Sequence, residues 1–132
     1  MRRRMMTPLL ALAIAIGCGG ESTSSPPPPP ATLTGSWGGV AVTQPTTLTL
    51  LENNGVVSGT GTIANTPTGT RALTVTGIFT NGTNFSLTLS SGTIQPINFS
   101  GTLNRTVTAP QQLIGTFTGS GFNGEAVILS KQ

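Results

Sequence analysis

The sequence has no histidine, no tyrosine and no aspartate, and only 7% of its residues are charged. It contains a single cysteine, Cys18, and a single tryptophan. A serine or threonine nucleophile would therefore lack its usual base. Zinc, iron and copper would lack the imidazole and thiolate ligands that they prefer. We expect no enzyme activity, no catalytic residues, no cofactor and no metal site.

The N-terminus has the pattern of a secretory signal. Arg2, Arg3 and Arg4 form a positive cluster, and an apolar stretch over residues 8–16 follows it. A transmembrane helix needs about 20 apolar residues, so this stretch is too short to span a bilayer. A positive segment before a short apolar run is typical of a cleaved signal peptide. We predict a signal peptide over residues 1–17; a buried core helix is disfavoured, because the glycines and prolines that follow give it nothing to pack against.

Residues Ala15, Ile16, Gly17 and Cys18 resemble the lipobox of bacterial lipoproteins. The resemblance implies that a signal peptidase recognises the first three residues, and that the Cys18 sulfur receives a diacylglycerol before its new amine is acylated. Gly19, rather than aspartate, follows the cysteine, which in that family favours the outer membrane over the inner membrane. The expected location is the bacterial cell envelope, with palmitate-like acyl chains as the membrane contact. The alternatives for Cys18 are a free thiol or half of an intermolecular disulfide.

Cleavage before Cys18 would leave a chain without net charge. The whole chain has a net charge of +3, but its first three arginines leave with the signal peptide. Three basic and three acidic residues remain, and 3 − 3 gives zero: Arg71, Arg105 and Lys131 against Glu21, Glu52 and Glu125. Nucleic-acid binding depends on basic residues that neutralise phosphates, so we expect no nucleic-acid partner. A glycosidase needs two opposed carboxylates, whereas we interpret Glu52 and Glu125 as solvated charges.

Residues 18–32 are small, polar and rich in proline, which predicts a linker after the lipidated cysteine. The five prolines of residues 26–30 would add roughly 15 Å if they adopt polyproline II, at about 3.1 Å per residue. A plain spacer is the favoured interpretation. The alternative is a proline ligand for the aromatic groove of a partner.

Residues 33–132 are predicted to form one all-β domain. Apolar and polar residues alternate with period two, as in Phe85, Leu87 and Leu89, which predicts strands rather than helices. Turn signals occur at residues 45, 53–55, 67–69, 81–82, 91–92, 109–110 and 123–124. Eight short antiparallel strands in a meander are expected, and a closed barrel is favoured over a sandwich. The expected strands cover residues 33–42, 46–52, 56–63, 71–80, 84–90, 97–104, 113–119 and 125–131.

Six glycines lie on the apolar face of these expected strands: Gly35, Gly59, Gly61, Gly77, Gly101 and Gly115. Glycine inside a strand usually marks a bend or a close approach of backbones. In a small barrel it permits strong curvature and leaves room for Trp37, Phe79, Phe99 and Phe117 in the interior. We favour this packing role for the glycines, and a glycine-lined ligand cavity is the alternative.

The stretch Leu33 to Trp37, "LTGSW", resembles the start of avidin-like and lipocalin-like barrels, in which a Gly-x-Trp of the first strand plugs one end. Biotin binding is not implied, because the chain has no tyrosine, no aspartate and no second tryptophan. The overall likeness is to short bacterial lipoproteins with a threonine- and glycine-rich β-domain.

Two functions are compatible with these features. The first is a structural or interaction module, lipid-anchored to the envelope, that presents a threonine-rich face or a sheet edge to an envelope protein. The second is a carrier whose barrel holds a small apolar ligand. An embedded porin-like barrel is disfavoured, because its outer face would be apolar, whereas threonine and serine dominate the second face here.

Overall fold

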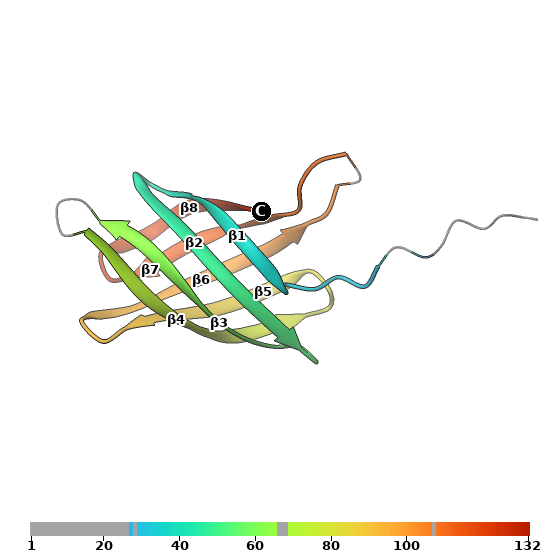
Figure 1. The fold of residues 1–132 in the computed structure, drawn as a ribbon, viewed down its shortest axis with the longest axis horizontal. Coiled ribbons are helices and arrows are strands. Elements are labelled where there is room, and N and C mark those ends of the chain that lie inside the picture. Colours follow the sequence, from blue (N-terminus) through green and yellow to red (C-terminus); the bar gives the residue numbers. More distant parts are fainter. Residues whose placement is uncertain (1–26, 28, 66–68, 107) are drawn as a thin grey trace, which may run out of the picture.

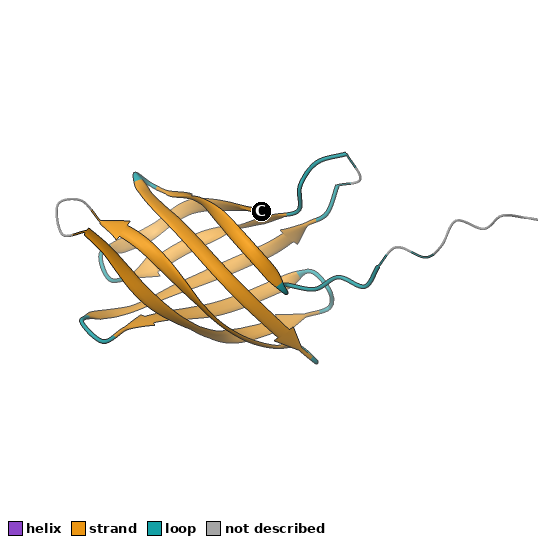
Figure 2. Ribbon diagram, in the orientation of Figure 1, coloured by secondary structure: helices purple, strands orange, loops and turns teal. Residues whose placement is uncertain are grey.

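The computed structural model describes residues 27, 29–65, 69–106 and 108–132. Its eight strands follow one another as an antiparallel meander, and β1 pairs with β8 to close a barrel (Figure 1). No helix occurs among the described residues (Figure 2). The all-β class and the closed barrel are therefore confirmed. The strands are β1 (Gly35–Ala41), β2 (Gln44–Asn53), β3 (Val56–Asn65), β4 (Gly69–Thr80), β5 (Asn84–Ser91), β6 (Ile94–Asn104), β7 (Gln112–Gly119) and β8 (Phe122–Lys131).

The apolar face of every strand points into the barrel. In β5, for example, Phe85, Leu87 and Leu89 are buried, whereas Ser86 and Ser90 between and beside them are exposed. An eight-stranded barrel is just wide enough for such side chains to fill its interior. The largest fully buried side chains are Trp37, Phe99, Phe117, Leu33, Leu48, Ile63, Leu87, Leu89, Ile97, Leu113, Leu129 and Val57.

Glycines on the inner face allow neighbouring strands to approach closely. Gly101 of β6 and Gly115 of β7 are paired directly. A Cβ atom on Gly101 would lie 2.0 Å from the carbonyl oxygen of Ile114, and one on Gly115 would lie 2.1 Å from that of Ser100. The same kind of clash with a partner-strand carbonyl would occur at Gly59, Gly61 and Gly77. These glycines therefore make room for the backbone.

The prediction of a turn at Asn123 and Gly124 is wrong. The chain reverses at Ser120 and Gly121, whose φ angles are 51° and 92°, and β8 begins at Phe122. A register shift leaves Gly124 without a partner in β7, and its φ angle is 86°. It therefore forms a β-bulge. An Asn-Gly pair tolerates positive φ in a bulge as well as in a turn, which explains the error.

The prediction of a turn at Pro45 is also wrong. The turn lies at Val42 and Thr43, and Pro45 lies in β2, where it pairs with Val40. Pairing of β2 with β3 begins only at Thr46. Pro45 thus has a strand partner on one side only, which is a position where a strand tolerates proline.

The end of the predicted linker is seated against one end of the barrel. Leu33 is completely buried, and its carbonyl accepts a hydrogen bond of 2.9 Å from the Trp37 indole nitrogen. The Thr32 hydroxyl donates to the Glu52 carboxylate at 2.8 Å, and the same carboxylate accepts from the Gly55 amide at 2.9 Å. Glu52, interpreted from the sequence as a solvated charge, therefore joins the linker to the β2–β3 turn.

We call the end of the barrel that receives the linker the linker end, and the opposite end the mouth. Strand β1 begins at the linker end, where the C-terminus of β8 also lies (Figure 1). Because consecutive strands are antiparallel, the β1–β2, β5–β6 and β7–β8 turns all lie at the mouth. The two ends thus differ in structure, since the linker packs against only one of them.

Candidate functional site

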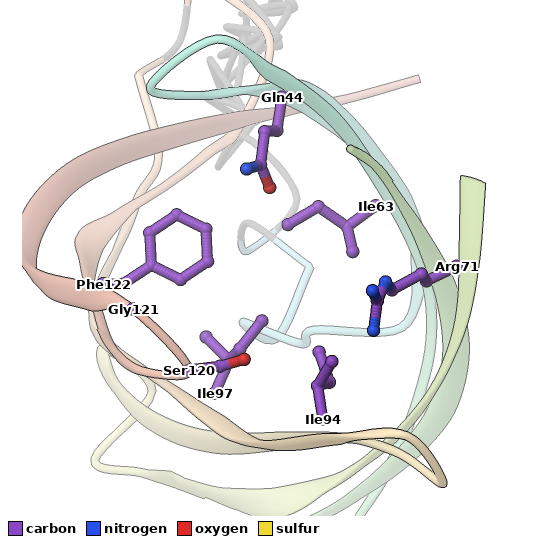
Figure 3. A pocket seen from close by; sticks show the side chains of 8 residues that line it. All are labelled: Gln44, Ile63, Arg71, Ile94, Ile97, Ser120, Gly121 and Phe122. Carbon is purple, nitrogen blue, oxygen red and sulfur yellow. The ribbon is translucent and has the colours of Figure 1, made fainter. Parts of the chain in front are cut away.

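A cavity of about 300 Å³ lies at the mouth and opens to solvent (Figure 3). Strands distant in the sequence form its wall, because β2, β3, β4, β6 and β8 each contribute a residue near the strand end at the mouth. Its volume is at the lower end of the range for ligand pockets, about 300–1,000 Å³. The lining residues are Gln44, Ile63, Arg71, Ile94, Ile97, Ser120, Gly121 and Phe122.

The floor and much of the wall are apolar. Ile63 and Ile97 are 2% and 1% exposed, and Ile94 and Phe122 are half-buried and pack against the core. The Phe122 ring is held by the ring of Phe117 in an edge-to-face contact, with centroids 5.2 Å apart. Because Phe117 is itself fully buried, Phe122 packs against the core of the barrel.

This contact is the last of an edge-to-face row through the barrel. The Phe85 and Phe99 centroids are 4.7 Å apart, and those of Phe99 and Phe117 are 4.9 Å apart. Such pairs contribute about 0.5–1.5 kcal/mol each beyond the area that they bury. The row therefore supports the wall of the cavity on the β8 side.

Three polar side chains line the same cavity. The Arg71 guanidinium and the Gln44 amide both extend into it (Figure 3), and Ser120 lies in the turn at its rim. Arg71 is half-buried and continues the inward face of β4 that carries Leu73 and Val75. Its Nη1 donates to the Thr93 hydroxyl at 3.2 Å, which directs the guanidinium toward the neighbouring β5–β6 turn.

No carboxylate lines the cavity among the described residues. Glu52 is bound at the linker end, as described above. Glu125, expected at the head of the last strand, accepts a hydrogen bond from the Asn123 amide at the bulge of β8. The positive charge of Arg71 is therefore the one formal charge in the described wall of the cavity.

The aromatic residues predicted for the interior lie in the core. Trp37, Phe99 and Phe117 have no exposed surface, and Phe79 is 7% exposed. None of the four lines the mouth cavity, so they fill the barrel and do not form a binding site there. The predicted signal peptide with Ala15, Ile16 and Gly17, and the lipidation site Cys18, lie outside the described residues.

Sequence reasoning missed the mouth cavity, although one signal for it was present. Arg71 is the charged residue at an inward position of the stretch "RALTVTGIFT", in phase with Leu73, Val75 and Phe79. A charged residue on an apolar face near a strand end indicates a site where a barrel opens to solvent. The contributions of Gln44 and of the β7–β8 turn carry no such signal.

Comparisons with models of protein families, with curated proteins and with solved structures found no match. Within the described part of the chain, no helix is long and apolar enough to cross a membrane. No group of three or more histidine, cysteine, aspartate or glutamate side chains gathers among those residues. The described wall of the cavity thus combines apolar side chains with one guanidinium, one amide and one hydroxyl.

Proposed function

We propose that the protein is a lipid-anchored module of the bacterial cell envelope that binds a small molecule at the mouth of its barrel. The observation that carries the proposal is the cavity of about 300 Å³, in which apolar side chains meet three polar groups. A concave apolar pocket with a few convergent polar groups is the usual form of a small-molecule site. The buried aromatic residues leave the mouth, rather than the middle of the barrel, as the place for a ligand.

The position of the cavity suits an anchored binding protein. The linker joins the barrel at the opposite end, where Arg105 Nη2 donates to the Pro29 carbonyl at 2.8 Å and Leu33 is buried. An anchor at Cys18 and the linker after it would therefore not obstruct the mouth. This arrangement supports capture of a ligand from the aqueous side of the envelope.

The proposal is tested by filling the cavity. Ile94 and Gln95 are neighbours in β6, but Ile94 lines the cavity whereas Gln95 is exposed and does not line it. We expect Ile94→Trp to abolish ligand binding and Gln95→Trp to preserve it. The full-length protein in nanodiscs is examined by scanning calorimetry with octanamide, octanoate and octylamine.

A ligand at ten times its Kd stabilises the folded state by about 1.4 kcal/mol, which raises the Tm of a domain of this size by roughly 6–11 °C. We expect such a shift for the wild type and for Gln95→Trp with at least one of the three amphiphiles. A shift that persists in Ile94→Trp, or the absence of a shift with all three, would contradict binding at the mouth.

A second function, contact with a protein partner, is favoured by an outer apolar row formed by Ile114, Ile128 and Val40. Ile128 pairs with both of the others, and the three are 37%, 49% and 54% exposed. Side chains paired across strands lie about 4.5–5.5 Å apart, so the row is continuous. A partner that adds a strand is disfavoured, because the described strands close on themselves and leave no free edge.

The second function is tested by photo-crosslinking in intact cells. A photoreactive residue at position 128 is expected to give a discrete protein adduct. The control position is Thr76, which also faces outward but is flanked by Ser58 and Thr88 on the neighbouring strands. Equal adducts from both positions, or none from position 128, would argue against a partner on the outer apolar row.

A further inference from the structure

We propose that the mouth selects monocarboxylates with an apolar body, which bind with the carboxylate on Arg71 and the apolar part against Ile63, Ile97 and Phe122. The inference rests on the proposed ligand-binding function and adds the chemical class of the ligand. It follows from the position of one charge in the cavity and from the burial of the apolar side chains beneath it.

Arg71 differs from the other basic residues of the described chain. Arg105 lies on the β6–β7 connection and binds the Pro29 carbonyl. The Lys131 ammonium lies 5.5 Å from the centre of the Trp37 ring, as a cation–π contact. Both of these groups are at the linker end. Arg71 is therefore the basic side chain that the described structure places at the mouth.

The guanidinium of Arg71 has capacity for a ligand. It carries five N–H donors in a planar fork, and one of them donates to Thr93 among the described residues. No carboxylate of the described wall neutralises it. A carboxylate fits this fork with two parallel hydrogen bonds, and such charge-assisted pairs are about twice as strong as neutral ones. A ligand carboxylate would thus supply the counter-charge that the wall lacks.

The rest of the cavity determines the other half of the ligand. Ile63 and Ile97 at the floor are almost completely buried, and Phe122 forms the wall opposite Arg71 (Figure 3). An apolar tail would cover these side chains, and Gln44 and Ser120 line the cavity apart from Arg71 (Figure 3). A single guanidinium matches one negative charge, which favours a monocarboxylate over a doubly charged phosphate. The attraction is local, because the chain after the predicted cleavage has no net charge.

The experiment compares octanoate with octanamide, which has the same tail and no charge, by titration calorimetry on the full-length protein in nanodiscs. We expect the wild type to bind octanoate roughly tenfold more tightly, as one charge-assisted pair implies. Arg71→Met removes the charge and retains an unbranched side chain in place of the aliphatic part of arginine, so the two affinities are expected to become equal. Arg105→Met, which removes the arginine at the linker end, is expected to keep the tenfold preference.

The outcomes separate the ligand class from the binding function. If wild-type protein binds octanamide as tightly as octanoate, the carboxylate preference is wrong while binding at the mouth stands. If neither binds, the carboxylate proposal fails, and binding at the mouth fails with it when octylamine gives no shift in Tm either. A preference that survives in Arg71→Met overturns the role of Arg71. Should Arg71→Met fail to fold, Arg71→Lys retains the charge without the fork, and an undiminished preference in that variant would exclude two-point binding by the guanidinium.

Discussion

Replacing Gly101 with alanine is expected to lower the free energy of unfolding by about 3 kcal/mol, the upper part of the usual range for overpacking. A Cβ atom at this position would lie 2.0 Å from the Ile114 carbonyl oxygen and 2.5 Å from the Gly115 Cα. Both are backbone atoms of β7, so relief requires that β6 and β7 separate. For a domain of about 100 residues this loss corresponds to a decrease in Tm of about 12–24 °C.

The matched control is Gly92→Ala. Gly92 lies exposed in the turn between β5 and β6, and a Cβ atom there would have no neighbour within 4 Å. Alanine reduces the conformational freedom of the unfolded chain, so this variant is expected to be neutral or slightly more stable. Urea unfolding of the two variants and the wild type measures the difference. Equal midpoints for Gly101→Ala and the wild type would show that the barrel does not depend on the close contact of β6 and β7.

The inner and outer faces of the strands could be predicted from the sequence because burial on one face imposes a period of two on the chain. Leu48, Val75 and Leu129, for example, are buried as their positions in the alternation require. The inward glycines added the evidence for strong curvature, which favoured a closed barrel. Alternation does not fix where a strand starts, however, and the start of β8 was placed three residues too late.

The mouth cavity could not be predicted in the same way, because it depends on which strand ends meet in three dimensions. Gln44, Arg71 and Phe122 are far apart in the sequence, and they converge only once the barrel has closed and its register is set. The error at Asn123 also removed Phe122 from the expected strands. The fifth phenylalanine of the chain was therefore missing from the predicted interior, although it completes the aromatic row.

Under the proposed function, the two ends of the barrel have separate roles: attachment at the linker end and binding at the mouth. At the linker end, side chains form hydrogen bonds with the segment that leads into the barrel. Trp37 donates to the Leu33 carbonyl, Glu52 accepts from the Thr32 hydroxyl, and Arg105 donates to the Pro29 carbonyl. At the mouth, Arg71 and Gln44 face an open cavity. Substitutions at the mouth are thus expected to alter binding without altering attachment, and the anchor can be tested independently of the ligand.

The largest effect on location is expected from Cys18→Ser, which should move the protein from the membrane fraction to the soluble fraction. A single acyl chain binds a membrane only marginally, with a constant of about 10⁴ M⁻¹, whereas two or three chains anchor a protein stably. Serine lacks the sulfur that would carry the diacylglycerol, so all of that affinity is lost at once. The comparison is fractionation of cells that express the wild type, Cys18→Ser or Ser22→Ala, the last of which changes a nearby linker residue and should remain bound.

Mass spectrometry of the wild-type protein provides the second measurement of the same prediction. We expect a mature chain that begins at Cys18 and carries the mass of its acyl groups, since the sequence before it has the form of a signal peptide and a lipobox. Membrane retention of Cys18→Ser would show that another part of the chain holds the protein in place. A wild-type product with residues 1–17 still attached and without fatty acid would exclude the lipid anchor, while binding at the mouth would still be decided by Ile94→Trp and Gln95→Trp.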